Sequence, residues 1–134
     1  MYKKIIVPMA LDHGVGNKGM DIAKGLRSAG GEIIAFHALE PIPRAVRHYI
    51  SAQQTQETED RAKAVLEERI ANMENARAVV LSGHAGWAIT ELAENIGADC
   101  IVISSHKPGL QHLLLGSTAA RVVRHANCAV HVVR

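Results

Sequence analysis

The stretch "ITELAENIGADCIVISSH", residues 89–106, contains a helix pattern and a strand pattern joined by one glycine. Its first apolar side chains recur three or four residues apart, at Ile89, Leu92, Ala93 and Ile96. This spacing places them on one face of a helix, and Gly97 follows where a helix C-cap is expected. The next run, "CIVI", is short, apolar and rich in β-branched residues, as buried strands are. We therefore predict a helix followed by a buried strand whose polar end opens a loop.

The same alternation of short apolar runs and helical patterns extends along the whole chain. The runs that predict strands are residues 5–9, 32–39, 77–81, 100–103 and 129–133. Besides the helix above, three apolar groups have helical spacing: Ile22, Ala23 and Leu26; Ala62, Val65, Leu66, Ile70 and Met73; and Ala119, Val122, Val123 and Ala126. The glycines of "RSAGGE", residues 27–32, predict the C-cap of the first of these helices. Alternating strands and helices predict a doubly wound α/β domain, a parallel sheet with helices on both faces.

Length and composition favour one ordinary globular domain, residues 1–134. Apolar residues make up 48% of the chain but only four residues are aromatic, so we expect an aliphatic core. A net charge of +2 is too balanced to indicate binding to nucleic acid or to an anionic membrane surface. The apolar run near the N-terminus is too short for a signal peptide or a membrane span, and we expect Cys100 and Cys128 to be reduced core thiols. These features favour a cytoplasmic protein.

The longest predicted connection is "EPIPRAVRHYISAQQ", residues 40–54. It contains two prolines and leads through a polar run into the second helix. Two interpretations are open: it folds over an edge of the ligand site, or it is simply long.

Candidate binding residues gather where two predicted strands end. In open parallel sheets, ligands bind beyond the carboxyl ends of the strands, where the strand order reverses. In the 2-1-3-4-5 class of windings, that crevice lies beside the first strand. The first strand ends in "VPMALDHG", with Pro8 closing the strand and Asp12 in the loop, and the fourth ends at Ser104.

The last helix begins at Gly116, Ser117 and Thr118, which form a candidate phosphate site. Free backbone N–H groups and the helix dipole favour an anion there, and both hydroxyls can donate to phosphate oxygens. His106 and Lys107 on the preceding loop add a titratable donor and a positive charge. The alternative is that one hydroxyl is an N-cap and Lys107 is a solvated loop charge.

Three long segments resemble the universal stress protein family, and the similarity covers nearly the whole chain. They are "MYKKIIVPM", "SGHAGWAITELAENIGADCIVISSHKPG" and "LLLGSTAARVVRHANCAVHVVR". The resemblance implies a Rossmann-like or flavodoxin-like α/β domain, of the adenine nucleotide alpha hydrolase-like type, with strand order 3-2-1-4-5. It also implies a homodimer that pairs through the last strand.

The resemblance further implies binding of ATP or another adenine nucleotide, with or without Mg²⁺. The family motif is Gly, two residues, Gly, nine residues, Gly, then Ser or Thr. Gly116 and Ser117 match its end, whereas Ser104 and Lys107 stand where the first two glycines would be and the loop is one residue shorter. The form "SHKPG…LLGS" resembles a subgroup of small bacterial members with Ser-His-Arg-Pro at this place, among which nucleotide binding is known.

The residue roles that the resemblance implies are distributed over four segments. The family has an Asp two residues after the strand-ending proline, where this chain has Ala10, so the role passes to Asp12. Adenine is expected near Ala38 at the end of the second strand. The complete expected site is Pro8, Met9, Ala10, Asp12, Ala38, Ile103, Ser104, His106, Lys107, Gly116, Ser117 and Thr118.

The function that we predict is an adenine-nucleotide-binding regulatory or stress-response module, acting as a dimer with an unidentified protein partner. The alternative is a nucleotide-free dimerisation module of the same fold. The chain has no GxSxG nucleophile motif and no P-loop, so we expect at most slow ATP hydrolysis or autophosphorylation at Ser117 or Thr118. Trp87 is expected to be a partly buried packing residue, and no metal site is expected from "HANCAVH" because residues three apart on a strand face opposite sides.

Overall fold

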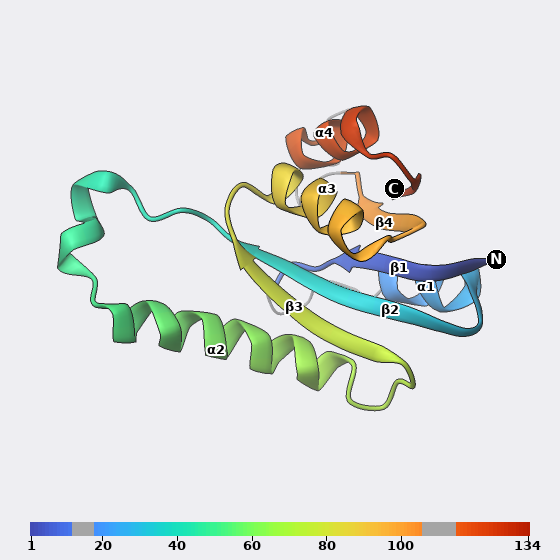
Figure 1. Cartoon of the computed structure of the whole chain (residues 1–134), viewed down its shortest axis with the longest axis horizontal. Helices are drawn as coiled ribbons and strands as arrows, with labels where there is room; N and C mark the ends of the chain where they lie inside the picture. Colours follow the sequence, from blue (N-terminus) through green and yellow to red (C-terminus); the bar gives the residue numbers. More distant parts are fainter. Residues whose placement is uncertain (12–17, 106–114) are drawn as a thin grey trace.

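The fold is a five-stranded parallel sheet with the strand order β3-β2-β1-β4-β5 (Figure 1). The structure is a computed structural model and describes residues 1–11, 18–105 and 115–134. The strands are β1 (Tyr2–Pro8), β2 (Arg27–Leu39), β3 (Ala76–Ser82), β4 (Cys100–Ser104) and β5 (Ala129–Val133). The order 3-2-1-4-5 implied by the resemblance is confirmed, whereas the 2-1-3-4-5 winding is wrong. Strand β3 lies outside β2, and the chain then returns to place β4 on the other side of β1, so the strand order still reverses beside β1.

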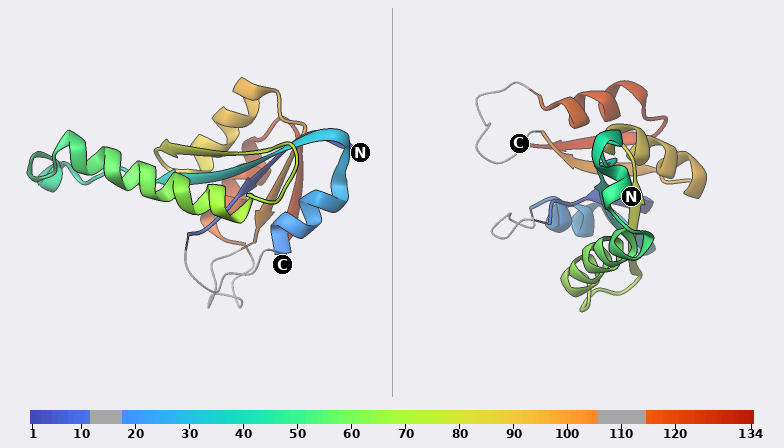
Figure 2. Two further views of the ribbon diagram at one scale, coloured as in Figure 1. Left: turned by 90° about the horizontal axis from the view of Figure 1, so that it is seen from below. Right: turned by 90° about the vertical axis from the view of Figure 1, so that its left-hand side faces the viewer.

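Helices cover both faces of the sheet, as predicted (Figure 2). They are α1 (Lys18–Leu26), α2 (Ala52–Arg69), α3 (Ala85–Ile96) and α4 (Ser117–His125), together with the short 3₁₀ helix η1 (Arg44–Tyr49). Helices α1 and α2 pack on one face, and α3 and α4 pack on the other. Within the described ranges, no helix combines the length and the apolar composition needed to cross a membrane.

The core lies on both sides of the three central strands. Along β1, Ile5 and Val7 face α1 and α2, whereas Ile6 faces α3 and α4, and each is almost fully buried. Strands β2 and β4 alternate in the same way. The core is mainly aliphatic, as predicted, with Phe36 as its one fully buried aromatic ring among the described residues. Cys100 is buried in it, and burial raises the pKa of this thiol to about 11.

The glycines of residues 27–32 do not cap α1, so that prediction is wrong. Strand β2 begins at Arg27, directly after the helix, and contains Gly30 at φ +75° and Gly31. A Cβ on Gly31 would lie 3.0 Å from the carbonyl oxygen of Tyr2, so these glycines allow β2 to bulge against β1. Gly97 does cap α3, with a left-handed φ of +69°, as predicted.

Several apolar residues depart from the helix faces predicted for them, and Ile70 and Ala126 are C-cap residues just beyond α2 and α4. Val123 on α4 is 48% exposed, because α4 buries only a narrow face, formed by Ala119 and Val122. Met73 lies beyond α2, which ends at Arg69, although it still packs on the core.

The long connection extends away from the sheet (Figures 1 and 2). It contains η1, and its side chains are exposed from Pro43 to Ser51. Helix α2 then starts with a capping box between Ser51 and Gln54, a local signal that fixes the helix start. Of the two interpretations, the structure favours a projecting segment over one that covers the site.

Asp99 joins the beginnings of β1 and β4 at the amino edge of the sheet. Its two carboxylate oxygens accept hydrogen bonds from the backbone N–H groups of Lys3 and Lys4, each at 2.9 Å. Partial burial raises the pKa of this carboxyl, but the N–H groups and the charge of Lys3 outweigh that effect and lower the pKa below its ordinary value of 3.8.

We expect Asp99→Asn to destabilise the protein by about 1 kcal/mol at neutral pH, because a charge-assisted hydrogen bond is replaced by an amide that can accept at one position only. Since the folded-state pKa lies below the unfolded one, the stabilisation by Asp99 is complete above pH 3.8 and is lost as the pH falls through the folded pKa. Urea unfolding of both proteins across this range should show the difference shrinking in acid. A difference that is unchanged there would contradict the role of the charge.

Candidate functional site

The site is built at the carboxyl ends of β1 and β4, where the strand order reverses. The two strands are neighbours, with Ile6 opposite Ile101. Two residues further along each strand are Pro8 and Ile103, so both strands end at the same edge of the sheet. The structure thus brings together the two strand ends that were predicted to form the site.

Side chains from β2 and α2 hold the start of the first loop. The N–H of Met9 donates to the carbonyl of Phe36 at 2.7 Å, which extends the β1–β2 ladder beyond Pro8. His37 Nδ1 lies 2.8 Å from the carbonyl oxygen of Met9, so this nitrogen carries the proton and donates. Arg69, at the end of α2, donates to the carbonyl of Ala10 at 2.6 Å. The backbone of this loop start is therefore fixed before any ligand arrives.

One backbone hydrogen bond places the start of α4 at the end of β4. The N–H of Gly116 donates to the carbonyl of Ser105 at 2.5 Å, and the N–H of Ser105 donates to the carbonyl of Val133 at 2.8 Å. Ser105 is 1% exposed. The two described ends of the 106–114 segment therefore meet, and the N-terminus of α4 lies at the carboxyl edge of the sheet.

The first turn of α4 directs backbone N–H groups at this edge. Gly116 is its N-cap residue, in an extended conformation that any residue can adopt, and its carbonyl accepts from the N–H of Ala120 at 2.9 Å. The N–H groups of Ser117, Thr118 and Ala119 precede that bond, so no carbonyl within α4 itself accepts from them. Together with the helix dipole, they favour an anion.

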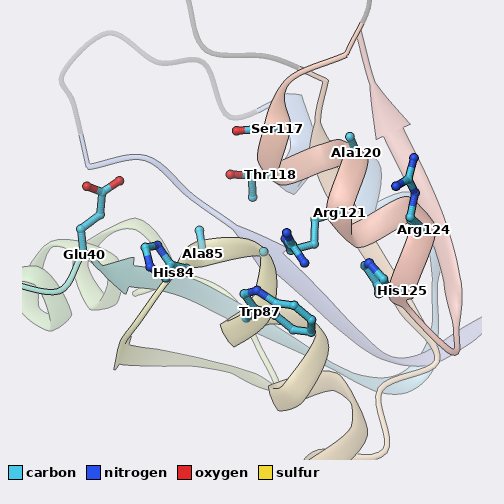
Figure 3. Close-up of a pocket in the computed structure, with 11 residues that line it drawn as sticks. Glu40, His84, Ala85, Trp87, Ser117, Thr118, Ala120, Arg121, Arg124 and His125 are labelled. Carbon is cyan, nitrogen blue, oxygen red and sulfur yellow. The ribbon is translucent and has the colours of Figure 1, made fainter.

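A cleft of about 680 Å³ extends from this helix start between α3 and α4 (Figure 3). We call it the α3–α4 cleft. Its lining residues are Glu40, His84, Ala85, Gly86, Trp87, Ser117, Thr118, Ala120, Arg121, Arg124 and His125. The α4 side supplies two hydroxyls and two guanidinium groups, whereas Glu40 is the carboxylate among these residues.

Trp87 and Arg121 meet across the cleft. The guanidinium carbon of Arg121 lies 4.3 Å from the centre of the Trp87 ring, and the His125 ring stacks on the same indole at 5.5 Å between centroids. Gly86 permits this approach, because a Cβ at that position would lie 2.7 Å from Cδ of Arg121. Trp87 is 53% exposed, whereas a partly buried packing residue was expected at this position.

The predicted site residues that the structure describes lie at four places along the edge: the ends of β1, β2 and β4, and the start of α4. Those within the described ranges are Pro8, Met9, Ala10, Ala38, Ile103, Ser104, Gly116, Ser117 and Thr118. Ser117 and Thr118 line the α3–α4 cleft, and Ala38 lies near the end of β2, paired with Leu81 of β3. Asp12, His106 and Lys107 lie outside the described residues.

Sequence reasoning missed the contribution of α3 and of the polar face of α4. Ser117 and Arg121 are four residues apart, so they share one helix face, and this spacing could have pointed to Arg121. No spacing in the sequence relates Arg121 to Trp87 or Glu40, which belong to other elements. His125 is the last residue of α4 and stacks on Trp87.

Comparison with known proteins identifies the family. A sequence model of the universal stress protein family matches residues 1–134. The chain belongs to this family. Universal stress protein G from Shigella flexneri and from Escherichia coli O157:H7 is 32% identical over 142 residues, and the alignment covers 100% of this chain and of each relative.

Solved structures of family members have the same fold. Universal stress protein UspA from Lactobacillus plantarum aligns with a TM-score of 0.79 at 21% identity, covering 99% of this chain and 98% of that one. A universal stress protein in complex with cAMP aligns with a TM-score of 0.63 at 24% identity, covering 99% and 97%. The universal stress protein from Archaeoglobus fulgidus in complex with dAMP aligns with a TM-score of 0.62 at 19% identity, covering 99% and 98%.

We expect Gly86→Ala to displace the Arg121 side chain from Trp87, because the added methyl group would overlap its Cδ atom. Any gain in helix propensity, at most about 1 kcal/mol, is then offset by a lost cation–π contact of about 0.5–1 kcal/mol. Trp87 is the one tryptophan in the chain, so its emission should report the displacement directly. Gly25→Ala on α1 is the control, since its Cβ meets nothing within 4 Å. Unchanged Trp87 emission in Gly86→Ala would contradict the contact.

Proposed function

We propose that this universal stress protein binds an adenine nucleotide at the carboxyl edge of its sheet and acts as a regulatory module. The observation that carries the proposal is the hydrogen bond from Gly116 to Ser105, which holds the donor-rich start of α4 beside the end of β4. A ligand lying over the ends of β1 and β4 would therefore have a phosphate-binding helix N-terminus within reach.

Each part of the ligand has a proposed place. Adenine lies against the backbone near Ala38, with Pro8, Met9, Ala10, Ile103 and Ser104 lining the base and ribose. Phosphate lies on the N–H groups and hydroxyls at Gly116, Ser117 and Thr118. Asp12 takes the role of the family aspartate, and His106 and Lys107 face the phosphate.

The related structures support an adenine ligand. The two family members described above were solved with cAMP and with dAMP, which share an adenine base and one phosphate. We extend the proposal to ATP, with or without Mg²⁺. Magnesium in nucleotide sites is commonly held by one or two carboxylates together with phosphate oxygens, and Glu40 supplies one carboxylate in the cleft.

The proposed role is binding rather than catalysis. Phosphoryl-transfer enzymes need a P-loop lysine or paired carboxylates for magnesium, and the sequence contains neither pattern. Slow ATP hydrolysis, or autophosphorylation at Ser117 or Thr118, is the most that we propose. We also propose a cytoplasmic location and a protein partner that reads the nucleotide-bound state.

The direct test is to denature freshly purified protein and identify any released nucleotide by chromatography and mass spectrometry. The stripped, refolded protein is then titrated with ATP, with and without magnesium, by calorimetry. Retained adenine nucleotide or saturable ATP binding would support the proposal. Absence of both would favour the second candidate, a nucleotide-free dimerisation module.

We expect Gly116→Asp to weaken ATP binding by roughly 100-fold or more, because like charges about 4 Å apart at a protein surface repel by about 4 kcal/mol. The fold should survive, since the backbone at Gly116 is extended and Asp is a favoured N-cap residue. Gly116→Asn is the matched control, because it has the same size and capping ability without the charge. Calorimetry should show much weaker binding for Asp than for Asn; equal affinities would contradict a phosphate at this position.

A specific observation also favours the proposed dimer. Strand β5 is an edge of the sheet, its neighbour on one side is β4, and Val130 and Val132 on it are half-buried. Sheet edges with apolar side chains are usually covered, and pairing with a second copy would cover this one.

We expect His131→Asp to shift the protein toward monomer. His131 is the middle residue of β5 and is exposed, so in a two-fold strand pair it would face its own copy, and two carboxylates would repel. Sedimentation equilibrium should give a dimer for the natural chain and a smaller species for the variant. Lys24→Glu on α1 is the control for a change of surface charge. A dimer that resists His131→Asp would show that β5 is not the interface.

A further inference from the structure

The α3–α4 cleft continues beyond the helix start that the proposed function uses. Ser117 lies at the start of α4, Arg121 lies one helical turn further along, and Arg124 almost one turn beyond that. All three line the cleft, so a row of donors and positive charges follows one face of the helix (Figure 3). Such a row fits an anion that carries several charges in sequence.

Arg121 is held in place but not neutralised. Its guanidinium lies over the Trp87 ring at 4.3 Å, and the side chain is half-buried. Among the described residues, neither Arg121 nor Arg124 forms an ion pair with a carboxylate. Stacking uses the face of a guanidinium and leaves the N–H groups at its edge free to donate in the plane, which suits phosphate oxygens.

The α3–α4 cleft is larger than a single phosphate requires, and its positive charges lie in a row. A volume of about 680 Å³ is in the range of sites for whole small-molecule ligands, roughly 300–1,000 Å³. Figure 3 shows Glu40 and Arg124 toward opposite ends of the cleft, with Arg121 on the side of Arg124. The negative charge therefore does not neutralise the guanidinium pair.

We propose that the α3–α4 cleft holds the distal phosphates of an adenine nucleotide and that Arg121 makes the protein select nucleoside di- and triphosphates over monophosphates. The proposal rests on the proposed function, because it takes the first phosphate to lie at Ser117. Arg121 then donates to the next phosphates along the helix, and Trp87 fixes the orientation of its guanidinium.

The experiment uses the full chain, stripped of any bound nucleotide, and three probes: ATP, AMP and inorganic tripolyphosphate. Calorimetry measures affinity, and Trp87 emission reports occupancy of the cleft because this chain has no other tryptophan. We expect ATP to bind about tenfold or more tightly than AMP, the effect of one hydrogen bond between charged groups. ATP and tripolyphosphate should change the emission, and AMP should change it little.

Arg121→Gln tests the residue itself. It keeps most of the aliphatic side chain and removes the charge, so ATP affinity should fall to that of AMP while AMP affinity is unchanged. Lys24→Gln is the control for loss of one positive charge, because Lys24 lies on α1, which packs on the opposite face of the sheet. Gly86→Ala is a second variant, which retains Arg121 but displaces it, and it should also lower the preference for ATP. Circular dichroism and thermal unfolding confirm that each variant is folded.

The outcomes separate this proposal from the proposed function. Equal affinities for ATP and AMP in the natural chain, or an ATP preference that persists in Arg121→Gln, would overturn the selection by Arg121. If neither nucleotide binds, the proposed function fails, and the tripolyphosphate titration still reports on the cleft. An emission change that Arg121→Gln abolishes would support a polyphosphate site there, and no change in the natural chain would overturn it.

Discussion

The burial of both faces of β1, β2 and β4 is the constraint on which the rest of the structure depends. Ile5, Ile6, Ile33, Ile34 and Ile101 are completely inaccessible, and each contributes roughly 1.5–3 kcal/mol by leaving water. A polar side chain at such a position would need a buried partner, because an unpaired polar group in the core costs about 1–3 kcal/mol. The buried positions of the central strands are therefore apolar, and among the described residues the buried polar side chains are Thr90 on α3 and Ser105 beyond the end of β4. Asp99 joins two strands at the amino edge of the sheet. The candidate ligand site lies at the opposite, carboxyl edge.

At the carboxyl edge, one backbone hydrogen bond places the start of α4 beside the strand ends that form the candidate site. The carbonyl of Ser105 accepts the N–H of Gly116, and this fixes the start of α4 relative to β4. Helix α4 is then held against α3 by its narrow apolar face, Ala119 and Val122. Its remaining faces are free to carry Ser117, Arg121 and Arg124 into the cleft. The position of the proposed binding groups thus depends on the same packing that stabilises the helix.

The sequence was sufficient for features that depend on local spacing. Short apolar runs predicted the strands, helical spacing predicted the helices, and Gly97 predicted the end of α3, because these signals depend only on neighbouring residues. The glycines after α1 were misread, because their role depends on the distant carbonyl of Tyr2. The exposure of Val123 likewise follows from how far α4 is rotated against the sheet, which no local pattern fixes. Trp87 and Arg121 are 34 positions apart in the sequence, so their contact could be found only in the folded chain.

The glycine at position 86 lowers the stability of α3 but permits the contact between Trp87 and Arg121. A glycine within a helix is less favourable than alanine by about 0.5–1 kcal/mol, and Gly86 is the second residue of α3. The contact that it permits, a guanidinium over an indole, contributes about 0.5–1 kcal/mol at a half-exposed position. The two effects nearly cancel, so the stability of the folded state gains little from this arrangement. What the arrangement does change is the position of a positive charge: it holds the Arg121 guanidinium against α3 inside the cleft, where an extended side chain would otherwise move freely in solvent. The local geometry of Gly86 and Trp87 therefore contributes little to the stability of α3, and it places a positive charge where the proposed anion site requires one.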